Sequence, residues 1–109
     1  MVKQGSIIKL NFNSQAGHEQ DGYRPAVVLS NNIFNEKTNL TIVCPITNTN
    51  NDFPLHVPLD KRTKTTGVIL CEHIKALDLN RRKYQIVETI PNDILENVID
   101  IVYSEIERI

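Results

Sequence analysis

The sequence predicts a mainly β fold with some α structure: a small antiparallel β-barrel or sandwich, followed by one C-terminal amphipathic helix. Five short apolar runs, rich in β-branched residues, recur between loops of Asn, Thr, Gly and Pro. This spacing favours antiparallel strands over repeated β-α-β units. From residue 91 onward the pattern changes, and apolar side chains recur at intervals of three and four, as on one face of a helix.

The five apolar runs give the expected strands in chain order. Residues 7–12 alternate apolar and polar side chains, as in a half-buried strand. Continuous apolar runs begin at Ala26 (AVVL) and at Leu40 (LTIVCPI), as in buried strands. The last two strands are LHVPL, in which Pro58 marks a strand end or an edge, and GVILCEHIKAL, which ends at Leu77.

The expected terminal helix begins at Pro91, a residue that suits the first helical position. Asp93 and Glu96 in its early turns and Arg108 in its last turn complement the helix dipole. One face is apolar and should pack on the strands; its residues are Ile94, Leu95, Val98, Ile99, Val102, Ile106 and Ile109.

The composition is that of an ordinary soluble domain. The chain has 109 residues, of which 40% are hydrophobic, enough for one domain over residues 1–109 without disulfide staples. No apolar run reaches the roughly 18 residues of a membrane span, and the start of the chain lacks the apolar segment of a signal peptide. We therefore expect a cytoplasmic protein. Cys44 and Cys71 lie in apolar runs, so buried reduced thiols are expected rather than a disulfide or a metal pair.

The net charge of −1 conceals an asymmetry along the chain. Residues 1–87 carry 11 Lys or Arg against 7 Asp or Glu, whereas residues 88–109 carry 1 against 6. Because salt screens exposed charges beyond about 8 Å, a basic surface on the first part can bind a polyanion although the whole molecule is near neutral. The alternative for the acidic tail is simply the solvated face of a helix.

The stretch GHEQDGYRPAVVLS, residues 17–30, contains the sharpest single feature. Arg24 precedes Pro25, which restricts it to an extended backbone, and a core strand follows at once. A guanidinium anchored in this way stays charged and offers a planar fork of donors that fits a phosphate. The alternative is a surface arginine that pairs with Asp21 or Glu19.

Three further residues could contribute polar chemistry. Thr47 ends the run VCPIT, where its hydroxyl could bond a phosphoryl oxygen or merely terminate a strand. His18 and Glu19 are adjacent in a loop flanked by glycines and could act as acid, base or orienting groups, or could simply be solvated.

A metal site is the competing use of such residues, and we expect none. The candidates are His18, His56, Cys71, Glu72 and His73, but no pair has the spacing of zinc ligands. Cys71, Glu72 and His73 would alternate between the faces of one strand. No phosphate loop, nucleophile elbow or dinucleotide fingerprint is present either, so no cofactor is expected.

Two basic clusters, Lys61-Arg62-Lys64 and Arg81-Arg82-Lys83, could line a track for single-stranded nucleic acid. Tyr23, Phe53 and Tyr84 would supply stacking surfaces for bases. Taken as isolated triplets, the clusters could equally be ordinary solvated loops.

These pieces together resemble the MazF/PemK (Kid) family of bacterial toxin ribonucleases. The resemblance covers essentially the whole chain, through KQGSIIKLNF, GHEQDGYRPAVVLS, VCPIT, TTGVILCEHIKALD and a helix begun by a proline. The most distinctive block is the family loop G-x-E-Q-x-G-x-R-P, whose fixed positions are met by Gly17, Glu19, Gln20, Gly22, Arg24 and Pro25.

The resemblance implies an SH3-like antiparallel β-barrel with a C-terminal helix, of the CcdB/PemK type, and a homodimer. It implies sequence-specific cleavage of single-stranded RNA without a metal, leaving 2′,3′-cyclic phosphate and 5′-hydroxyl ends. It also implies a cognate antitoxin whose acidic tail occupies the RNA groove. The family's catalytic arginine and threonine match Arg24 and Thr47, and its loop histidine matches His18.

The remaining roles follow from the chemistry of RNA cleavage and from the loops. Glu19 could hold the fork of Arg24 or act as base. In the PemK branch an arginine and an aspartate follow TTGV, but here Leu70 and Glu72 stand in their places, so the acid role is lost and only a base role for Glu72 survives. The residues expected to contact RNA are Gln20, Tyr23, Asn48, Phe53, Thr65, Thr66, Glu72 and His73.

Two other functions stay open at this point. Toxins such as CcdB share the barrel but bind DNA gyrase through the terminal helix; here the candidate chemistry lies in loops, which favours a nuclease. A non-catalytic RNA-binding barrel is the second alternative, because Leu70 cannot replace an acid.

Overall fold

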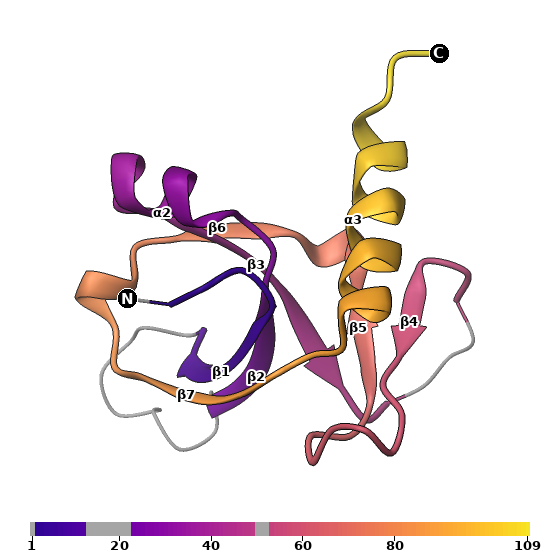
Figure 1. The fold of residues 1–109 in the computed structure, drawn as a ribbon, viewed down its shortest axis with the longest axis horizontal. Helices are drawn as coiled ribbons and strands as arrows, with labels where there is room; N and C mark the ends of the chain where they lie inside the picture. The colour runs from indigo at the N-terminus through magenta and orange to yellow at the C-terminus, as the bar shows by residue number, and fades with distance from the viewer. Residues whose placement is uncertain (1, 13–22, 50–52) are drawn as a thin grey trace.

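The computed structural model describes residues 2–12, 23–49 and 53–109, and Figure 1 shows an antiparallel sheet with one long helix against it. The strand order is β4-β5-β3-β2-β1-β7, and β6 pairs with β3 beside this path. The elements are β1 (Ser6–Asn11), β2 (Tyr23–Val28), α2 (Asn32–Thr38), β3 (Thr41–Thr47), β4 (His56–Pro58), β5 (Val68–Leu70), β6 (Lys75–Leu77), β7 (Tyr84–Thr89) and α3 (Asn92–Ile106). The mainly β fold with a C-terminal helix is thus confirmed. Among the described residues the strand pairs form an open path, so they do not close the barrel that the sequence suggested.

Strand β3 belongs to two parts of the sheet. Its first half pairs with β6, through Thr41 opposite Leu77, whereas its last two residues pair with β5, through Thr47 opposite Val68. Its middle, from Val43 to Pro45, also pairs with β2. The start of β3 therefore lies beside β6, and its end lies beside β5.

Two apolar clusters cover the two faces of the sheet, because successive side chains of a strand point to opposite sides. Ile7 and Val27 belong to the cluster that α3 covers with Ile94 and Val98. The other face is closed by the second cluster: Val2, Ile8, Leu10, Ala26, Val28, Val43, Leu77 and Leu79. Both faces of β1 and β2 are therefore buried over most of their length, which fixes their register.

Two elements were missing from the sequence-based prediction. Helix α2 is short and follows Asn31, whose side chain accepts a hydrogen bond from the backbone N–H of Phe34 at 2.8 Å. It ends at Asn39, which has a left-handed backbone with φ of 59°. Strand β7 was missed because its residues are mostly exposed or half-exposed and carry no continuous apolar run.

The structure corrects three expected boundaries. Strand β2 already begins at Tyr23, so Arg24 lies inside a strand rather than in the loop before it. The expected single strand at 67–77 is broken into β5, a 3-10 helix at Cys71–His73 and β6. Helix α3 ends at Ile106, so Arg108 lies beyond its last turn, and the side chains of Ile106 and Ile109 are exposed.

Two other expectations concern the thiols and the membrane. Cys44 and Cys71 are buried and unbridged, as expected, and burial raises the pKa of each thiol to about 12. None of the described helices is long and apolar enough to cross a bilayer.

Gly67 provides a test of the close contact between β3 and β5. Its φ is +120°, and a Cβ atom placed on it would lie 2.4 Å from the carbonyl oxygen of Thr47. We predict that Gly67→Ala lowers the free energy of unfolding by about 1–3 kcal/mol, because both the backbone strain and the clash oppose the native pairing. Urea denaturation measures this difference. The control is Lys61→Ala, an exposed residue of the preceding loop, and an equally small effect of both substitutions would contradict the close contact.

Candidate active site

Arg24 and Thr47 lie at the same end of the sheet, on neighbouring strands. The register of β2 and β3 pairs Ala26 with Pro45, and each of the two candidate residues is two positions further toward this end. Because side chains two apart in a strand share a face, Arg24 and Thr47 project from the same face of the sheet. The antiparallel pairing thus brings together two residues that are 23 positions apart in the chain.

Arg24 is exposed, and none of the carboxylates in the described part of the chain pairs with it. Its backbone is held by pairing with Leu10, a fully buried residue of β1, and by Pro25 on its other side. Its guanidinium therefore stands on a rigid base with its donors available for an anion. The two carboxylates proposed as alternative partners, Asp21 and Glu19, lie outside the described residues.

The hydroxyl of Thr47 is oriented by the turn that follows β3. Its Oγ1 accepts a hydrogen bond of 3.2 Å from the backbone N–H of Thr49. A hydroxyl that accepts through a lone pair still carries its own proton, so Thr47 can donate to a ligand oxygen. The next residue, Asn48, accepts a 3.0 Å hydrogen bond from the hydroxyl of Thr66, which ties the two loops at this end together.

The 60–66 loop is held in place by the carboxylate of Glu88 and by the ion pairs of Arg62. Glu88 of β7 accepts hydrogen bonds from the backbone N–H of Lys64 at 3.1 Å and from the backbone N–H and hydroxyl of Thr65, both at 2.8 Å. Arg62 forms bidentate hydrogen bonds with Asp60 and also bonds both carboxylate oxygens of Asp93. The charge of Arg62 is therefore neutralised within the protein, although the sequence placed it in a nucleic-acid track.

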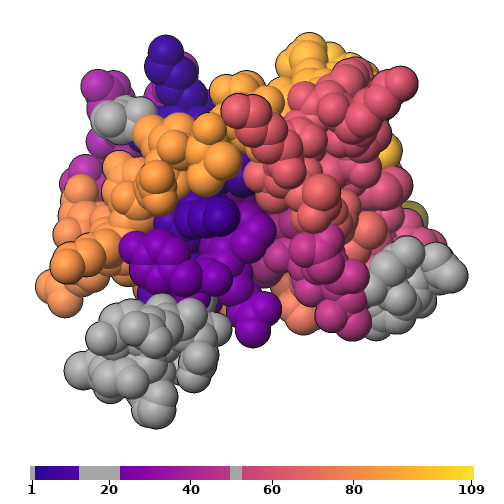
Figure 2. Space-filling model, turned by 90° about the horizontal axis from the view of Figure 1, so that it is seen from below, coloured from indigo at the N-terminus to yellow at the C-terminus, as the bar shows by residue number. Residues whose placement is uncertain are grey.

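A polar cleft of about 360 Å³ opens beside this loop. Lys9 of β1 and Lys64 of the loop line it, together with Pro25, Asn48, Thr65, Thr66 and Val87. In Figure 2 the indigo β1 and purple β2 lie between the orange β7 and the rose-coloured segment that follows β4. Three of the residues expected to contact RNA, namely Asn48, Thr65 and Thr66, thus share one cleft.

The second basic cluster is only partly available to a ligand. Arg82 donates hydrogen bonds to the backbone oxygens of Asn11 and Phe12, at 2.9 and 3.1 Å, and so has a structural role. Tyr23 donates to the backbone oxygen of Lys83 at 3.4 Å and keeps a half-exposed ring at the start of β2. Arg81, by contrast, is largely exposed and lies 3.7 Å from Asp78.

Glu72 and His73 form a separate group at the other end of β5. Because a carboxylate only accepts, the Nε2–H of the buried His56 donates to Glu72 at 2.9 Å, and Nε2 of His73 lies 3.7 Å from the same oxygen. The ring of Phe53 contacts His56 edge to face at a centroid distance of 5.3 Å. Thr47 pairs with Val68 at the start of β5, whereas His56 pairs with Leu70 at the end of β5. The group around Glu72 is therefore not beside the Arg24–Thr47 end.

The environment of Glu72 favours its ionised form. Partial burial alone would raise its pKa, but the hydrogen bond from His56, its own backbone N–H and the nearby imidazoles outweigh this and lower the pKa. The pKa of Glu105, at the end of α3, is instead raised, because burial and the negative charge of Glu72 both disfavour its ionised form. The contacts of Glu72 are thus those of a group that links β4 to the 3-10 helix.

Of the expected catalytic and binding residues, three lie outside the described part of the chain: His18, Glu19 and Gln20. Within the described ranges, no group of three or more His, Cys, Asp or Glu side chains is placed to hold a metal ion. The prediction from sequence missed Lys9 and Glu88 altogether. Lys9 was passed over as the polar member of an alternating strand, and Glu88 lies on β7, the strand that was not predicted.

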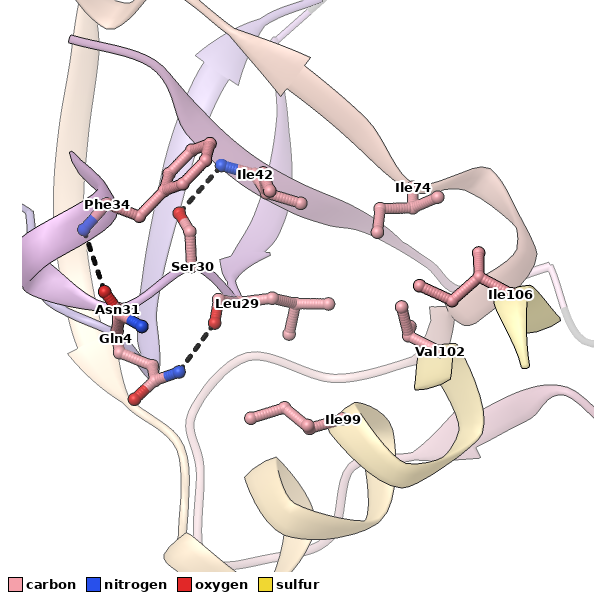
Figure 3. A pocket seen from close by; sticks show the side chains of 10 residues that line it. All are labelled: Gln4, Leu29, Ser30, Asn31, Phe34, Ile42, Ile74, Ile99, Val102 and Ile106. Carbon is pink, nitrogen blue, oxygen red and sulfur yellow. Dashed lines mark hydrogen bonds between the residues drawn. The ribbon is translucent and has the colours of Figure 1, made fainter. Parts of the chain in front are cut away.

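An apolar groove of about 310 Å³ lies on the other side of the molecule, between α3 and the region around α2. Figure 3 shows the side chains of Leu29, Ile42 and Ile74 pointing toward those of Ile99, Val102 and Ile106 across it. The groove is open, and Ile106 remains 78% exposed. In Figure 1 the last turns of α3 extend past the rest of the fold, which explains this exposure.

Comparison with known proteins places the chain among toxins. Residues 3–104 match the family described as PemK-like, MazF-like toxin of type II toxin-antitoxin system. The chain is 31% identical over 102 residues to Endoribonuclease PemK of Escherichia coli, covering 90% of this chain and 77% of that protein. It is also 31% identical to Endoribonuclease MazF of Staphylococcus epidermidis, covering 93% and 90%. A crystal structure of MazE-MazF from Deinococcus radiodurans superposes with a TM-score of 0.85, at 34% identity, covering 95% and 94% of the chains.

The bond between His56 and Glu72 predicts a pH dependence of stability. We expect Glu72→Gln to lower the free energy of unfolding by about 1–3 kcal/mol at pH 7, because a charged acceptor is lost from a buried donor. The folded-state pKa of Glu72 is lowered, so its contribution is present above the unfolded pKa of about 4.3 and is lost as the pH falls through the folded value. The difference between wild type and variant should therefore shrink in urea titrations below pH 4; a constant difference would contradict the assignment.

Proposed function

Because this chain belongs to the PemK-like, MazF-like family of type II toxins, we propose that it is an endoribonuclease that cleaves single-stranded RNA at specific sequences and inhibits growth as a toxin. The relatives are named endoribonucleases. Their names favour an RNA-cleaving enzyme over a gyrase-binding toxin or a non-catalytic RNA-binding protein. Cleavage proceeds without a metal and leaves a 2′,3′-cyclic phosphate and a 5′-hydroxyl.

The observation that carries the proposal is the meeting of Arg24 and Thr47 at one end of β2 and β3. RNA contains its own nucleophile, the 2′-hydroxyl next to the scissile phosphate, so the protein must orient the substrate and stabilise the charge of the phosphorane. Arg24 binds the non-bridging oxygens through its fork of donors, and Thr47 donates its hydroxyl proton to one of them. The high pKa of an arginine makes electrostatic stabilisation its main role.

The general base comes from the segment before β2. Glu72 is held by His56 at the other end of β5, so its geometry favours a structural role over proton abstraction. Glu19 or His18 is therefore the proposed base and orienting group, in line with the family resemblance. Leu70 cannot replace the arginine of the PemK branch, which leaves Arg24 as the principal cationic group.

The RNA track runs along the loops at this end of the sheet. Asn48, Thr65 and Thr66 line the cleft beside Lys9, and Tyr23 presents a half-exposed ring for stacking. Phe53 offers a second exposed ring next to His56. Gln20 is a further proposed contact in this track. Glu72 and His73, at the other end of β5, are proposed contacts for RNA that continues past this end of the sheet.

The wider setting follows from the family. The proposed toxin domain spans residues 1–109. We propose that its sheet belongs to the SH3-like barrel type. The protein acts in the cytoplasm on cellular RNA. The similar crystal structures are of MazE-MazF, which supports a cognate antitoxin for this chain as well. The acidic tail of that antitoxin occupies the RNA groove, in line with the family resemblance.

The apolar groove supports a homodimer. Ile106, an exposed apolar side chain at the end of α3, lines the groove together with Ile74 and Leu29. An exposed apolar surface of this kind is usually covered by a partner, and a second copy of the same chain would cover both surfaces by two-fold symmetry.

The catalytic assignment predicts the effect of removing Arg24. Arg24→Ala should lower kcat for cleavage of single-stranded RNA by about 100- to 1000-fold, because a preorganised charge facing the phosphorane is lost. The rate is measured in excess EDTA with purified protein. Arg108→Ala, which removes an exposed arginine beyond the end of α3, is the control and should cleave at the wild-type rate. Near-normal cleavage by a folded Arg24→Ala variant would refute the assignment.

The dimer assignment predicts a change in molecular mass. Ile106→Glu places a charge in the apolar groove and should shift the protein from dimer to monomer in sedimentation equilibrium. Ile86→Glu changes a half-exposed isoleucine on β7, away from the groove, and should leave the dimer intact. A monomeric wild-type protein, or a dimer that survives Ile106→Glu, would exclude this interface.

A further inference from the structure

The polar cleft beside the 60–66 loop contains two cations that have no assigned role. Lys9 and Lys64 both line it, and none of the carboxylates in the described ranges forms an ion pair with either ammonium group. Arg62, only two residues from Lys64, is by contrast fully engaged with Asp60 and Asp93. The fold therefore neutralises one cation of this loop and leaves another available in the cleft.

The cleft lies next to the proposed catalytic arginine. Lys9 is paired with Pro25 across β1 and β2, and Pro25 directly follows Arg24. Neighbouring residues of a strand point to opposite faces, so Arg24 projects from one face and the cleft lies on the other. A nucleic-acid strand that crosses the end of the sheet can contact Arg24 with one phosphate and the cleft with another.

The part of the loop that forms one wall of the cleft, Lys64 and Thr65, is bound by one carboxylate. Glu88 accepts three hydrogen bonds from Lys64 and Thr65, two of them from backbone N–H groups. These bonds fix the backbone from which Lys64, Thr65 and Thr66 point. Although burial opposes it, this set of donors, together with the charge of Lys64, lowers the pKa of Glu88, so the carboxylate is ionised at neutral pH.

We propose that this cleft is a second phosphate subsite of the RNA track, in which Lys9 and Lys64 bind a backbone phosphate other than the one cleaved. Glu88 is its positioning residue, since it touches the loop and not the RNA. The side-chain N–H groups of Asn48, whose oxygen accepts from Thr66, add neutral donors to the two cations. This assignment rests on the proposed function, because it takes single-stranded RNA as the ligand.

The subsite can be tested by the salt dependence of binding, with no cleavage involved. The probe is a fluorescent RNA oligonucleotide with 2′-O-methyl groups throughout, which lacks the nucleophile. Lys9→Gln/Lys64→Gln should weaken binding roughly 5-fold and reduce the slope of log K against log salt by about 0.7, the value for one lost phosphate contact on a single strand. Lys37→Gln, a change of the same type on α2, should leave both quantities unchanged.

The outcomes separate this subsite from the proposed function. If wild type cleaves natural RNA but the double variant keeps the wild-type slope, the subsite is wrong and the nuclease stands. If the double variant loses affinity for poly-glutamate but not for the RNA, the cleft binds protein carboxylates, which also overturns the assignment. If wild type neither binds nor cleaves RNA, both proposals fall.

Glu88→Gln tests the positioning role. Removal of a negative charge alone would strengthen the binding of a polyanion, so weaker binding would have to come from the displaced loop. We expect KM for a long RNA to rise about 3- to 5-fold with kcat unchanged, because the subsite binds substrate and transition state equally. A fall confined to kcat, or a KM equal to or below that of wild type, would overturn the role of Glu88.

Discussion

The pairing of β3 with three other strands is the constraint on which the site depends. Its middle pairs with β2, its first half with β6 and its last two residues with β5. The pairing with β2 brings Thr47 to the end of the sheet where Arg24 projects, and the pairing with β5 places Gly67 against the carbonyl of Thr47. A side chain at Gly67 would clash with Thr47 and push the preceding 60–66 loop away from the end of the sheet that holds Arg24 and Thr47. The glycine is therefore needed to place this loop beside the proposed cleft.

Charge is distributed so that some cations stabilise the fold while others remain available to a ligand. Arg62 and Arg82 are bound to carboxylates and to backbone oxygens, and both hold loops in place. Arg24, Lys9 and Lys64 make no ion pair with any described carboxylate, and they surround the start of β2 and the neighbouring cleft. A near-neutral protein can thus present a local basic surface, because three of its acids, Asp60, Asp78 and Asp93, pair with other arginines.

The sequence was sufficient to predict the fold class, the buried strands and the terminal helix, because the strands have continuous or alternating apolar runs and the helix has a strong three-to-four-residue period. It failed for β7 and α2, where exposed side chains give no period and a single Asn31 cap defines the helix start. Arg24 and Thr47 were identified from their places in the chain. Their proximity, however, depends on the register between β2 and β3, which the sequence of a single strand does not determine. The link from Glu88 to the loop joins residues more than 20 positions apart and requires the sheet to be known.

The central claim is that Arg24 and Thr47 act on the same phosphate, and a double-mutant cycle tests it most directly. Single-turnover cleavage rates of wild type, Arg24→Ala, Thr47→Ala and the double variant give the coupling between the two side chains. If both contact one phosphorane, the double variant should lose much less than the product of the two single losses. Losses that multiply would contradict the account, because they would mean that the two residues act independently.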